Sequence, residues 1–404
     1  MKKGISVEEA QELLLNLARK REAEKVSLTH SMNRVLACDI YASISIPPFN
    51  RSPLDGYALR GEDTEKASEE NPVILRITEE IYAGKAPEHV VVPGAAAKIL
   101  TGAPIPEGAN SVVRFEDTEW DSEYVRISEP VKPNVNFIYE GEELQKDSLI
   151  LKEGTLITPA VMGMMATQGI NSCSVYKKPT VAVITTGSEL TDVGEKLCRG
   201  KIYNSNLYTI SGYIRGLGLE CIEIGSVEDD LDSIASKINE ALEISDIVIT
   251  TGGASVGDYD YALSSLKKIG AEIIFWKVKM KPGAATLAAQ KDGKLILGLS
   301  GNPGSSTLGM MRVMQPYLLK CCGRTDYMPE EINVIMKHDF KKSSPGTRLL
   351  RGRLVINNGQ AFFEENAGQG NGMIKSFLGF DLVGEIPAGS PPVPAGAMIK
   401  AYRY

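Results

Sequence analysis

Three short apolar runs that end abruptly in glycine and small polar residues limit most strongly what this chain can fold into. They are TVAVITTGSEL (180–190), DIVITTGGASVGDYD (246–260) and LILGLSGNPGSS (295–306). A continuous β-branched run is typical of a strand buried on both faces, as in a parallel sheet. Glycine after such a strand lets backbone N–H groups approach a ligand, and open α/β sheets bind ligands at the carboxyl ends of their strands. We therefore expect an α/β domain with a site for an anionic small molecule at these turns.

The composition limits the classes of protein to which the chain can belong. At 404 residues a single core is unusual, so we expect two to four domains. A hydrophobic fraction of 43% with 24% charged residues is typical of soluble globular proteins. The formal charge of −7 argues against a nucleic-acid binder, because no basic excess exists to displace counterions. An anionic ligand must then be met by local cations, helix N-termini or a bridging metal.

Cysteine and histidine usage indicates the compartment and the metal chemistry. The six cysteines form no CxxC motif, which is typical of a reducing, cytoplasmic environment. Three histidines argue against a histidine-rich metal site. The charged start MKKGISVEEAQ is not a signal peptide, and no apolar run reaches the roughly 18 residues of a membrane span. We expect no membrane partner.

Changes in sequence pattern suggest the domain organisation. Short alternating runs from about residue 44 to residue 139, separated by Pro and Gly, predict a small β domain. The spacing of apolar residues over 230–242 predicts a helix that covers a sheet. After residue 326 the pattern returns to strands with Gly/Pro turns, which predicts a β-rich C-terminal domain.

Acidic residues follow the predicted strands, close to turns suited to an anion. They are Glu189, Asp229, Asp230, Asp258 and Asp260. Carboxylates would repel an anion unless a hard cation lay between them, and Mg²⁺ bound by one or two carboxylates and ligand oxygens resolves this conflict. The alternative is helix N-capping, for which Asp is favoured.

Three lysines alternate in FWKVKMKPG: Lys277, Lys279 and Lys281. In a strand all three would lie on one face, where ammonium groups need solvent or an anion. The alternative is an edge strand that lysines protect from pairing. The Pro-Gly that follows ends the strand and favours the anion site.

Two further turns carry polar residues, Asp55 in FNRSPLDGYALR and Thr101 in ILTGAP. Asp-Gly is an ordinary turn signal, so neither is specific on physical grounds. The sequence contains neither a GxGxxG that opens a helix after a strand nor a GxxxxGK[ST] motif. Dinucleotide sites and Walker-type nucleotide sites are therefore unsupported.

Taken together, six motifs resemble the MoeA/gephyrin E-domain family, the molybdopterin molybdenumtransferases of molybdenum-cofactor synthesis. The motifs are SPLDGYAL, ILTGAPIPEGANSVVRFED, TTGSEL, TTGGASVGDYDY, FWKVKMKPG and GLSGNPGSS. They occur in the family's order and cover nearly the whole chain.

The resemblance implies a multidomain α/β plus β fold with four domains. These are a helical linker domain (1–43 and 146–178), an inserted small β domain (44–145), a molybdopterin-binding α/β domain with a parallel sheet (179–326) and a C-terminal β-barrel-like domain (327–404). It also implies a homodimer in which one subunit's β domain faces the α/β and C-terminal domains of the other.

The implied reaction starts from adenylylated molybdopterin and molybdate, hydrolyses the adenylate with Mg²⁺ or Zn²⁺, inserts molybdenum into the dithiolene and releases AMP. By motif, the catalytic positions are Asp55, Thr101, Glu189, Asp229 and Asp260, with Glu189 and Asp229 on the metal. The glycine-turn residues expected at the substrate are Thr186, Gly187, Gly252, Gly253, Ser255, Gly301, Asn302 and Pro303. Lys277 and Lys281 match a basic pair near molybdate, and Arg351 is a looser match from the last domain.

The chain departs from the family's pattern at several positions. The usual GLPGNP has Ser300 in place of its first proline, and the usual KPGKP has Ala284 and Ala285 in place of lysine and proline. The family's RGED is here Glu140-Gly141-Glu142-Glu143, and an expected serine in the last domain is Asn371. These changes leave open a second hypothesis, a catalytically weak paralogue that binds molybdopterin or molybdate as a carrier, sensor or scaffold. A third, molybdopterin adenylylation, is opposed by the residues that precede the α/β domain.

Overall fold

The computed structural model describes residues 1–253 and 261–404, which divide into two compact units. The first unit contains residues Met1–Cys38, Glu153–Met162 and Asn171–Tyr404, and the second contains Asp39–Lys152 and Gly163–Ile170. We describe each unit by itself. None of the helices in the described parts combines the length and the apolar character that a membrane crossing requires.

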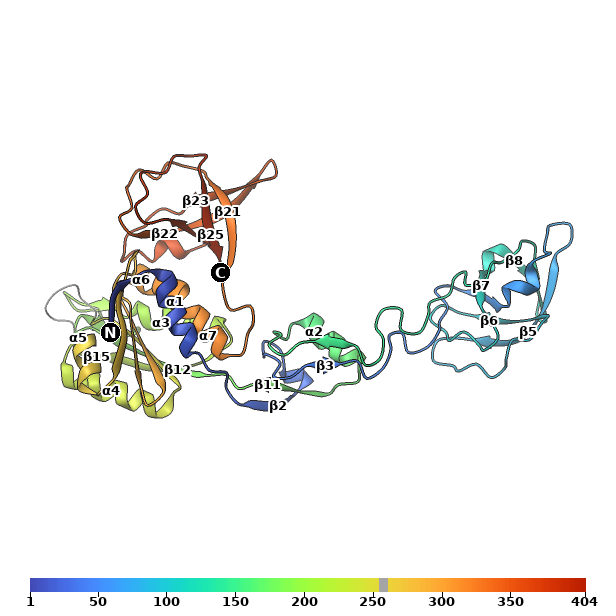
Figure 1. Cartoon of the computed structure of the whole chain (residues 1–404), viewed down its shortest axis with the longest axis horizontal. Helices are drawn as coiled ribbons and strands as arrows, with labels where there is room; N and C mark the ends of the chain where they lie inside the picture. Colours follow the sequence, from blue (N-terminus) through green and yellow to red (C-terminus); the bar gives the residue numbers. More distant parts are fainter. Residues whose placement is uncertain (254–260) are drawn as a thin grey trace. The chain divides into compact units, whose positions relative to one another are not determined.

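A seven-stranded sheet forms the centre of the first unit (Figure 1). Its strands, in order across the sheet, are β1 (Lys2–Ile5), β17 (Glu272–Val278), β19 (Leu287–Lys291), β20 (Lys294–Leu299), β16 (Ile247–Thr251), β12 (Thr180–Thr186) and β15 (Glu220–Val227). The predicted parallel arrangement holds for six strands. The exception is β19, which is antiparallel to both neighbours because a two-residue turn joins it to β20.

Helices cover both faces of this sheet, and the alternation of side chains along β12 shows why (Figure 1). Val181 and Val183 lie in the core with α1 (Val7–Leu17), α3 (Ser205–Gly216), α6 (Pro303–Gly309) and α7 (Gln315–Cys321), the last two joined by a π-helical turn. Ala182 and Ile184 lie in a second core with α4 (Leu231–Ile244) and α5 (Tyr261–Lys268). A strand whose successive residues are all buried needs an apolar layer on each side.

The first residues of the chain join this α/β layer. β1 pairs with β17, and α1 packs against α7, with Val7, Ala10 and Leu14 buried. We expected these residues in a helical linker domain. The remaining small pairings of the unit are β2 (Ala23–Ser27) with β11 (Ser172–Tyr176) and β13 (Leu190–Thr191) with β14 (Ile202–Tyr203). The four-domain division itself stays a prediction.

The C-terminal residues form a closed five-stranded barrel, as expected. Its strands are β21 (Glu330–Met336), β22 (Thr347–Asn357), β23 (Gln360–Glu365), β24 (Leu382–Ile386) and β25 (Met398–Arg403). The barrel closes because the long strand β22 pairs with both β23 and β24. A short strand, β18 (Met280–Lys281), pairs with the start of β22 and so links the α/β part to the barrel.

The second unit is built on a six-stranded sheet with an apolar core on each face. In order, its strands are β7 (Ser111–Arg114), β4 (Gly56–Leu59), β6 (Ala95–Ile99), β5 (Val73–Ile81), β9 (Tyr124–Ile127) and β8 (Thr118–Trp120). β4 lies next to the edge strand yet is buried along its whole length. The pair β3 (Ile40–Tyr41) and β10 (Leu149–Leu151) also belongs to this unit, and α2 spans Pro159–Thr167.

Candidate active site

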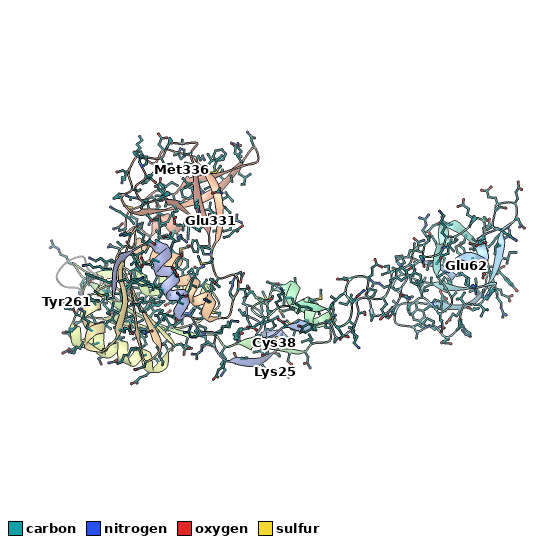
Figure 2. The ribbon with its side chains drawn as sticks, viewed as in Figure 1. Lys25, Cys38, Glu62, Tyr261, Glu331 and Met336 are labelled. Carbon is teal, nitrogen blue, oxygen red and sulfur yellow. The ribbon has the colours of Figure 1, made fainter. Side chains whose placement is uncertain are left out.

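A cleft of about 980 Å³ lies at the carboxyl ends of β12, β16 and β20, where the three glycine turns meet. The residues that line it are Thr186, Glu189, Ile202, Asp229, Gly252, Gly253, Tyr261, Met280, Lys281, Pro282, Gly283, Ala284, Ala285, Ser300, Gly301, Asn302, Pro303, Ser305, Asn371 and Gly372. Nine of them were predicted from the sequence as site residues. Tyr261, labelled in Figure 2, comes from the start of α5 and was missed.

The glycines allow the turns to pack backbone against backbone. A Cβ at Gly252, whose φ is +97°, would lie 2.1 Å from the carbonyl oxygen of Thr186. A Cβ at Gly301 would lie 3.3 Å from the Cα of Gly252. No side chain fits between the turns, so backbone groups form this part of the cleft wall.

Two buried asparagines at the start of α3 hold the third glycine turn and the end of β12 in place. The Asn206 side chain donates to the Gly301 carbonyl at 2.8 Å and accepts from the Ser306 hydroxyl at 3.3 Å. Asn204 donates to the Thr185 hydroxyl at 2.7 Å and caps the helix by accepting from the Leu207 amide. We did not predict these two residues as part of the site. The Asn-Ser-Asn sequence before an apolar helix was the available signal.

Glu189 and Asp229 line the cleft together, and the described part of the chain gives neither an ion-pair partner. Asp229 Oδ2 accepts from the Ser188 amide at 3.3 Å, whereas its Oδ1 is buried without a hydrogen-bond partner among the described residues. The hydroxyl of Thr186 is in the same situation. Gly187 lies behind Glu189, because a Cβ there would be 2.6 Å from Glu189 Oε2. The cleft therefore presents carboxylate oxygens that the fold does not use.

The other predicted acids have different outcomes. Asp230 is the N-cap of α4, because its carboxylate accepts from the Ser233 amide at 2.8 Å and the Asp232 amide at 3.1 Å. Hydrogen bonding from Ser233 lowers the pKa of Asp230. The alternative interpretation, helix capping, is thus the correct one for this residue. Asp258, Asp260 and Ser255 lie outside the described residues.

The donor set fits a magnesium ion better than zinc. In the described part of the chain no group of three His, Cys, Asp or Glu side chains could hold a metal. Two carboxylates, one with an unpaired buried oxygen, match Mg²⁺, which binds one or two carboxylates together with ligand phosphates and water. Zinc sites take three or four protein ligands, usually His or Cys.

The prediction that Lys277, Lys279 and Lys281 share one face is wrong. β17 ends at Val278, and Lys277 has a φ of +69°, which breaks the alternation. The Lys277 ammonium lies 4.3 Å from the ring centroid of Trp276. Lys277 is not among the residues that line the cleft. Lys281, in β18, does line the cleft.

Arg351 is fully buried behind the cleft wall rather than in the cleft. Its Nη2 donates to the carbonyls of Gly368 at 3.1 Å and Gly370 at 3.4 Å, in the loop that leads to Asn371. Nε and Nη1 have no hydrogen-bond partner in the described structure, and burial lowers the pKa of this guanidinium to about 10. Nη1 would meet a Cβ at Gly304 at 2.9 Å. Arg351 thus supports the cleft wall from strand β22 of the barrel.

Asp55 and Thr101 form their own contact in the second unit. Asp55 Oδ1 accepts from the Thr101 amide at 2.7 Å and from its hydroxyl at 2.8 Å. These two hydrogen bonds, the backbone one first, lower the pKa of Asp55. The contact fixes the orientation of a solvent-exposed carboxylate.

Four of the departures from the family pattern line the cleft: Ser300, Ala284, Ala285 and Asn371. The Ser300 hydroxyl accepts from the Asn302 amide at 3.3 Å, so the serine stabilises the turn where the family has proline. The segment that replaces RGED lies in the second unit, where the Glu143 amide donates to the Ile46 carbonyl.

Comparison with known proteins agrees with this geometry. Two family models match the chain, the MoeA N-terminal region (domain I and II) over residues 5–169 and a probable molybdopterin binding domain over residues 182–320. The molybdopterin molybdenumtransferase of Staphylococcus aureus (strain Mu50) is 38% identical over 392 residues, which is 97% of this chain and 94% of the relative. That of Staphylococcus epidermidis is 38% identical over 87% of this chain and 84% of the relative.

Among solved structures, the molybdopterin biosynthesis MoeA protein of Pyrococcus horikoshii superposes with a TM-score of 0.85 at 30% identity. The match covers 99% of both chains. Sequence and structure therefore agree over nearly the whole length. This chain belongs to the MoeA family of molybdopterin molybdenumtransferases.

Proposed function

We propose that this protein transfers molybdenum from molybdate to adenylylated molybdopterin and releases AMP. The observation that carries the proposal is the cleft at the carboxyl ends of β12, β16 and β20 in a member of this family. Three glycine turns, Lys281 and two carboxylates that have no ion-pair partner among the described residues meet there. Both proposed substrates are anions, and backbone N–H groups, lysines and a divalent cation are the groups that bind them.

Each group of residues has a separate role in this proposal, which follows from its chemistry. The turns at Gly252 and Gly301 bring backbone amides to the ligand, and Lys281 supplies a positive charge for molybdate. Glu189 and Asp229 would hold Mg²⁺, which, when bound, neutralises the pyrophosphate and polarises the phosphoryl oxygens for hydrolysis. Asn206 keeps the Gly301 turn at its place through its hydrogen bond. Arg351 acts on the opposite wall through the loop at residues 368–370.

The direct test is AMP release from adenylylated molybdopterin by the purified protein, with and without molybdate. We expect AMP release that depends on molybdate and on Mg²⁺, and that an equal excess of Zn²⁺ supports less well. AMP release that is unaffected by molybdate would contradict the transfer reaction.

A second candidate is a protein that binds molybdopterin or molybdate but turns over slowly. The observation in its favour is that Ala284 and Ala285 line the cleft where the family has lysine and proline. The same assay separates the candidates, because a carrier would bind the adenylylated pterin and release no AMP. Restoring the lysine with Ala284→Lys should then raise AMP release.

Assembly and location are further parts of the proposal. All six cysteines are free, which agrees with a cytoplasmic protein. We propose a homodimer in which Asp55 and Asp229 of one working site come from different subunits. Mixing Asp55→Ala with Asp229→Ala under subunit exchange should then return roughly a quarter of wild-type activity, because half the dimers are mixed and each has one intact site. No recovery, with exchange verified, would contradict shared sites.

A further inference from the structure

A second pocket of about 220 Å³ lies in the first unit, and its charged lining residues are all cationic. Four cations line it: Arg34, Lys178, Arg215 and Arg324. None of the other residues that line it is acidic. In a chain with a formal charge of −7, four cations around one small hollow need a physical reason.

The pocket is separate from the cleft of the proposed reaction. Lys178 lies two residues before the start of β12, whereas Thr186 of the cleft is the last residue of that strand. A strand of seven residues is about 23 Å long. Likewise α3 begins at the cleft with Asn206 and ends at the pocket with Gly216. The two hollows therefore lie at opposite ends of the same sheet.

The cations differ in how far their charge is already compensated. Arg215 pairs with Glu223 at 2.6 Å, Arg324 pairs with Asp326 at 2.7 Å, and Arg34 pairs with Glu24. These three acids are not among the residues that line the pocket.

Lys178 is the exception. It is half-buried and has no ion pair or hydrogen bond within the described residues. Its Nζ would lie 3.9 Å from a Cβ at Gly218, which is also a pocket residue. In addition, Arg34 Nε is buried without a partner among the described residues. A free ammonium and a free guanidinium N–H are therefore left at the pocket.

Capping of helix ends does not account for these free groups. The C-termini of α3 and α7 both reach the pocket, and a helix C-terminus attracts cations. Carbonyls in their last turns, however, already accept from backbone amides: Leu219 donates to Ile214 at 3.2 Å, and Gly323 donates to Lys320 at 2.9 Å. The Cys322 thiol donates to Leu318 at 3.2 Å. The helix ends therefore attract the cations, but the N–H donors of Lys178 and Arg34 do not bond to the carbonyls of those ends.

The protonation of the Cys322 thiol is a second indication of the electrostatic potential in the pocket. Burial raises the pKa of its thiol to about 12, while Lys178, Arg324 and Arg34 each act to lower it. The thiol therefore stays protonated and does not neutralise the cations. The negative charge that would balance the pocket must come from outside the lining residues.

We propose that this pocket, which we call the Lys178 pocket, binds a small tetrahedral oxoanion such as orthophosphate or molybdate. Guanidinium and ammonium groups are the side chains that recognise such anions, and Arg does so with two donors in a fixed geometry. The pocket volume is below the roughly 300–1,000 Å³ of sites for drug-sized molecules, so the ligand is the free ion rather than a nucleotide. This inference does not depend on the proposed transferase activity.

The test is isothermal titration of the full chain with inorganic phosphate, with molybdate and with AMP as three separate probes. Lys178→Gln should weaken the binding of phosphate about tenfold, as expected for the loss of one charge-assisted hydrogen bond. Lys177→Gln is the matched control, since Lys177 pairs with Glu22 at 3.2 Å and does not line the pocket. It should change binding by less than about twofold. Circular dichroism melts verify that each variant is folded.

Two further comparisons locate the site. Lys281→Gln should leave phosphate affinity at the Lys178 pocket unchanged, and the anomalous signal of tungstate soaked into crystals should appear beside Lys178. AMP should bind no more tightly in wild type than in Lys178→Gln. Equal phosphate affinity in wild type and Lys178→Gln, or tungstate absent from the pocket at saturating concentration, would overturn the proposal. Tighter AMP binding that depends on Lys178 would overturn the choice of a free ion.

Discussion

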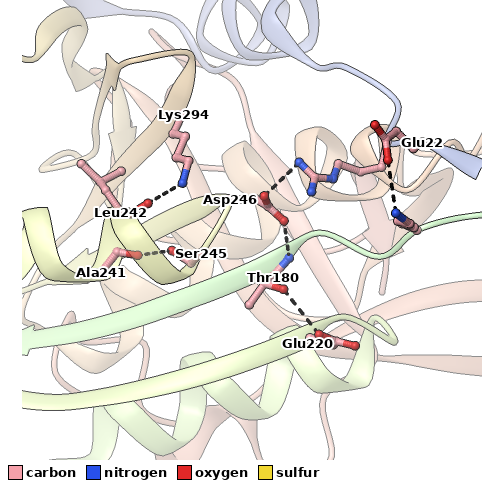
Figure 3. Close-up of polar contacts among 10 residues, drawn as sticks. Glu22, Thr180, Glu220, Ala241, Leu242, Ser245, Asp246 and Lys294 are labelled. Atoms are coloured by element: carbon pink, nitrogen blue, oxygen red, sulfur yellow. Dashed lines mark hydrogen bonds and ion pairs between the residues drawn. The ribbon is translucent and has the colours of Figure 1, made fainter.

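The two ends of the seven-stranded sheet use their polar groups in opposite ways. At the amino end, Asp246 precedes β16 and accepts from the Thr180 amide at 2.9 Å, while its other oxygen pairs with Arg21 at 2.9 Å (Figure 3). Thr180 in turn donates to Glu220 at 3.4 Å. The Ser245 hydroxyl donates to the Ala241 carbonyl at 2.6 Å, and Lys294 donates to Leu242. These polar groups bond to one another.

At the carboxyl end, buried polar atoms are left unpaired among the described residues. They are Asp229 Oδ1, Thr186 Oγ1 and Thr251 Oγ1, each at the end of a strand or just beyond it. A buried polar atom without a partner costs about 1–3 kcal/mol, so the fold does not gain from this arrangement. A ligand or a metal would supply the missing partners. The comparison teaches that the polar groups around Asp246 stabilise the amino end of the sheet, where the separate Lys178 pocket keeps free donors, and that the carboxyl end is kept for chemistry.

The largest predicted effect is on the free energy of unfolding, which should fall more when a glycine at the carboxyl end of the sheet is replaced than when one at the amino end is. Gly252→Ala should lower the free energy of unfolding by about 3 kcal/mol or more, because its Cβ meets the Thr186 carbonyl at 2.1 Å and its φ is +97°. Gly293, in the turn before β20, has a φ of +76° but open space around its Cβ. Gly293→Ala should cost only about 1 kcal/mol. Urea unfolding followed by circular dichroism measures both, and equal losses would show that the turns are not closely packed.

The next effect concerns the cation of the cleft. Lys281→Gln should raise the molybdate concentration needed for half-maximal AMP release about tenfold, with a smaller change in pterin binding. Lys279→Gln is the control, since Lys279 is exposed and does not line the cleft. If both variants shift the molybdate requirement equally, the contribution of Lys281 is only long-range charge.

The amino end should respond in stability alone. Asp246→Ala removes the acceptor of the Thr180 amide and the partner of Arg21, and should cost about 1–2 kcal/mol of unfolding free energy. AMP release per folded molecule should stay at the wild-type level. A large loss of activity in a stable Asp246→Ala protein would break the division between the two ends.

The smallest predicted effect is a change in the pKa of Asp55. The hydrogen bonds from Thr101 lower this pKa, so Thr101→Val, which removes the hydroxyl but keeps the amide, should raise it part of the way to its ordinary value. Because the folded pKa is lowered, Asp55 favours folding above its unfolded pKa, and this contribution is lost as the pH falls through the folded pKa. The valine variant should lose part of that pH dependence. NMR titration of the carboxyl carbon measures the shift, and Thr101→Ser should behave like wild type.

Local patterns predicted the strands and turns of the cleft well. The runs before Gly187 and Gly252 were correctly predicted to be buried strands. Burial on both faces and a glycine turn depend on a few neighbouring residues, so a local pattern is enough to predict them. These runs also predicted the α/β sheet, whereas the barrel form of the C-terminal domain followed from the family resemblance. The direction of β19 did not, because it depends on a short turn at Asp292 and Gly293.

Side-chain positions that depend on distant packing could not be predicted. Lys277 leaves the expected face because its amide donates to Thr286, across the turn that follows β18. Arg351 has the sequence pattern of an ordinary strand residue, and its burial depends on distant segments that include the loop at residues 368–370 and Phe377. Asn206 reaches the site because α3 begins beside the Gly301 turn, although that turn follows Asn206 by almost a hundred residues in the sequence. Each of these contacts joins segments that are distant in the sequence, and no local sequence pattern predicts that they lie close together.

The most direct test of the difference between the two ends is molybdate-dependent AMP release by Asp229→Asn and Asp246→Asn, assayed side by side. Both changes replace a carboxylate by an amide of the same shape, one at each end of the sheet. We predict a loss on the order of 10²-fold for Asp229→Asn, with unchanged or higher thermal stability, and activity close to wild type for Asp246→Asn. Near wild-type AMP release by Asp229→Asn at low Mg²⁺, or equal losses in the two variants, would contradict the account.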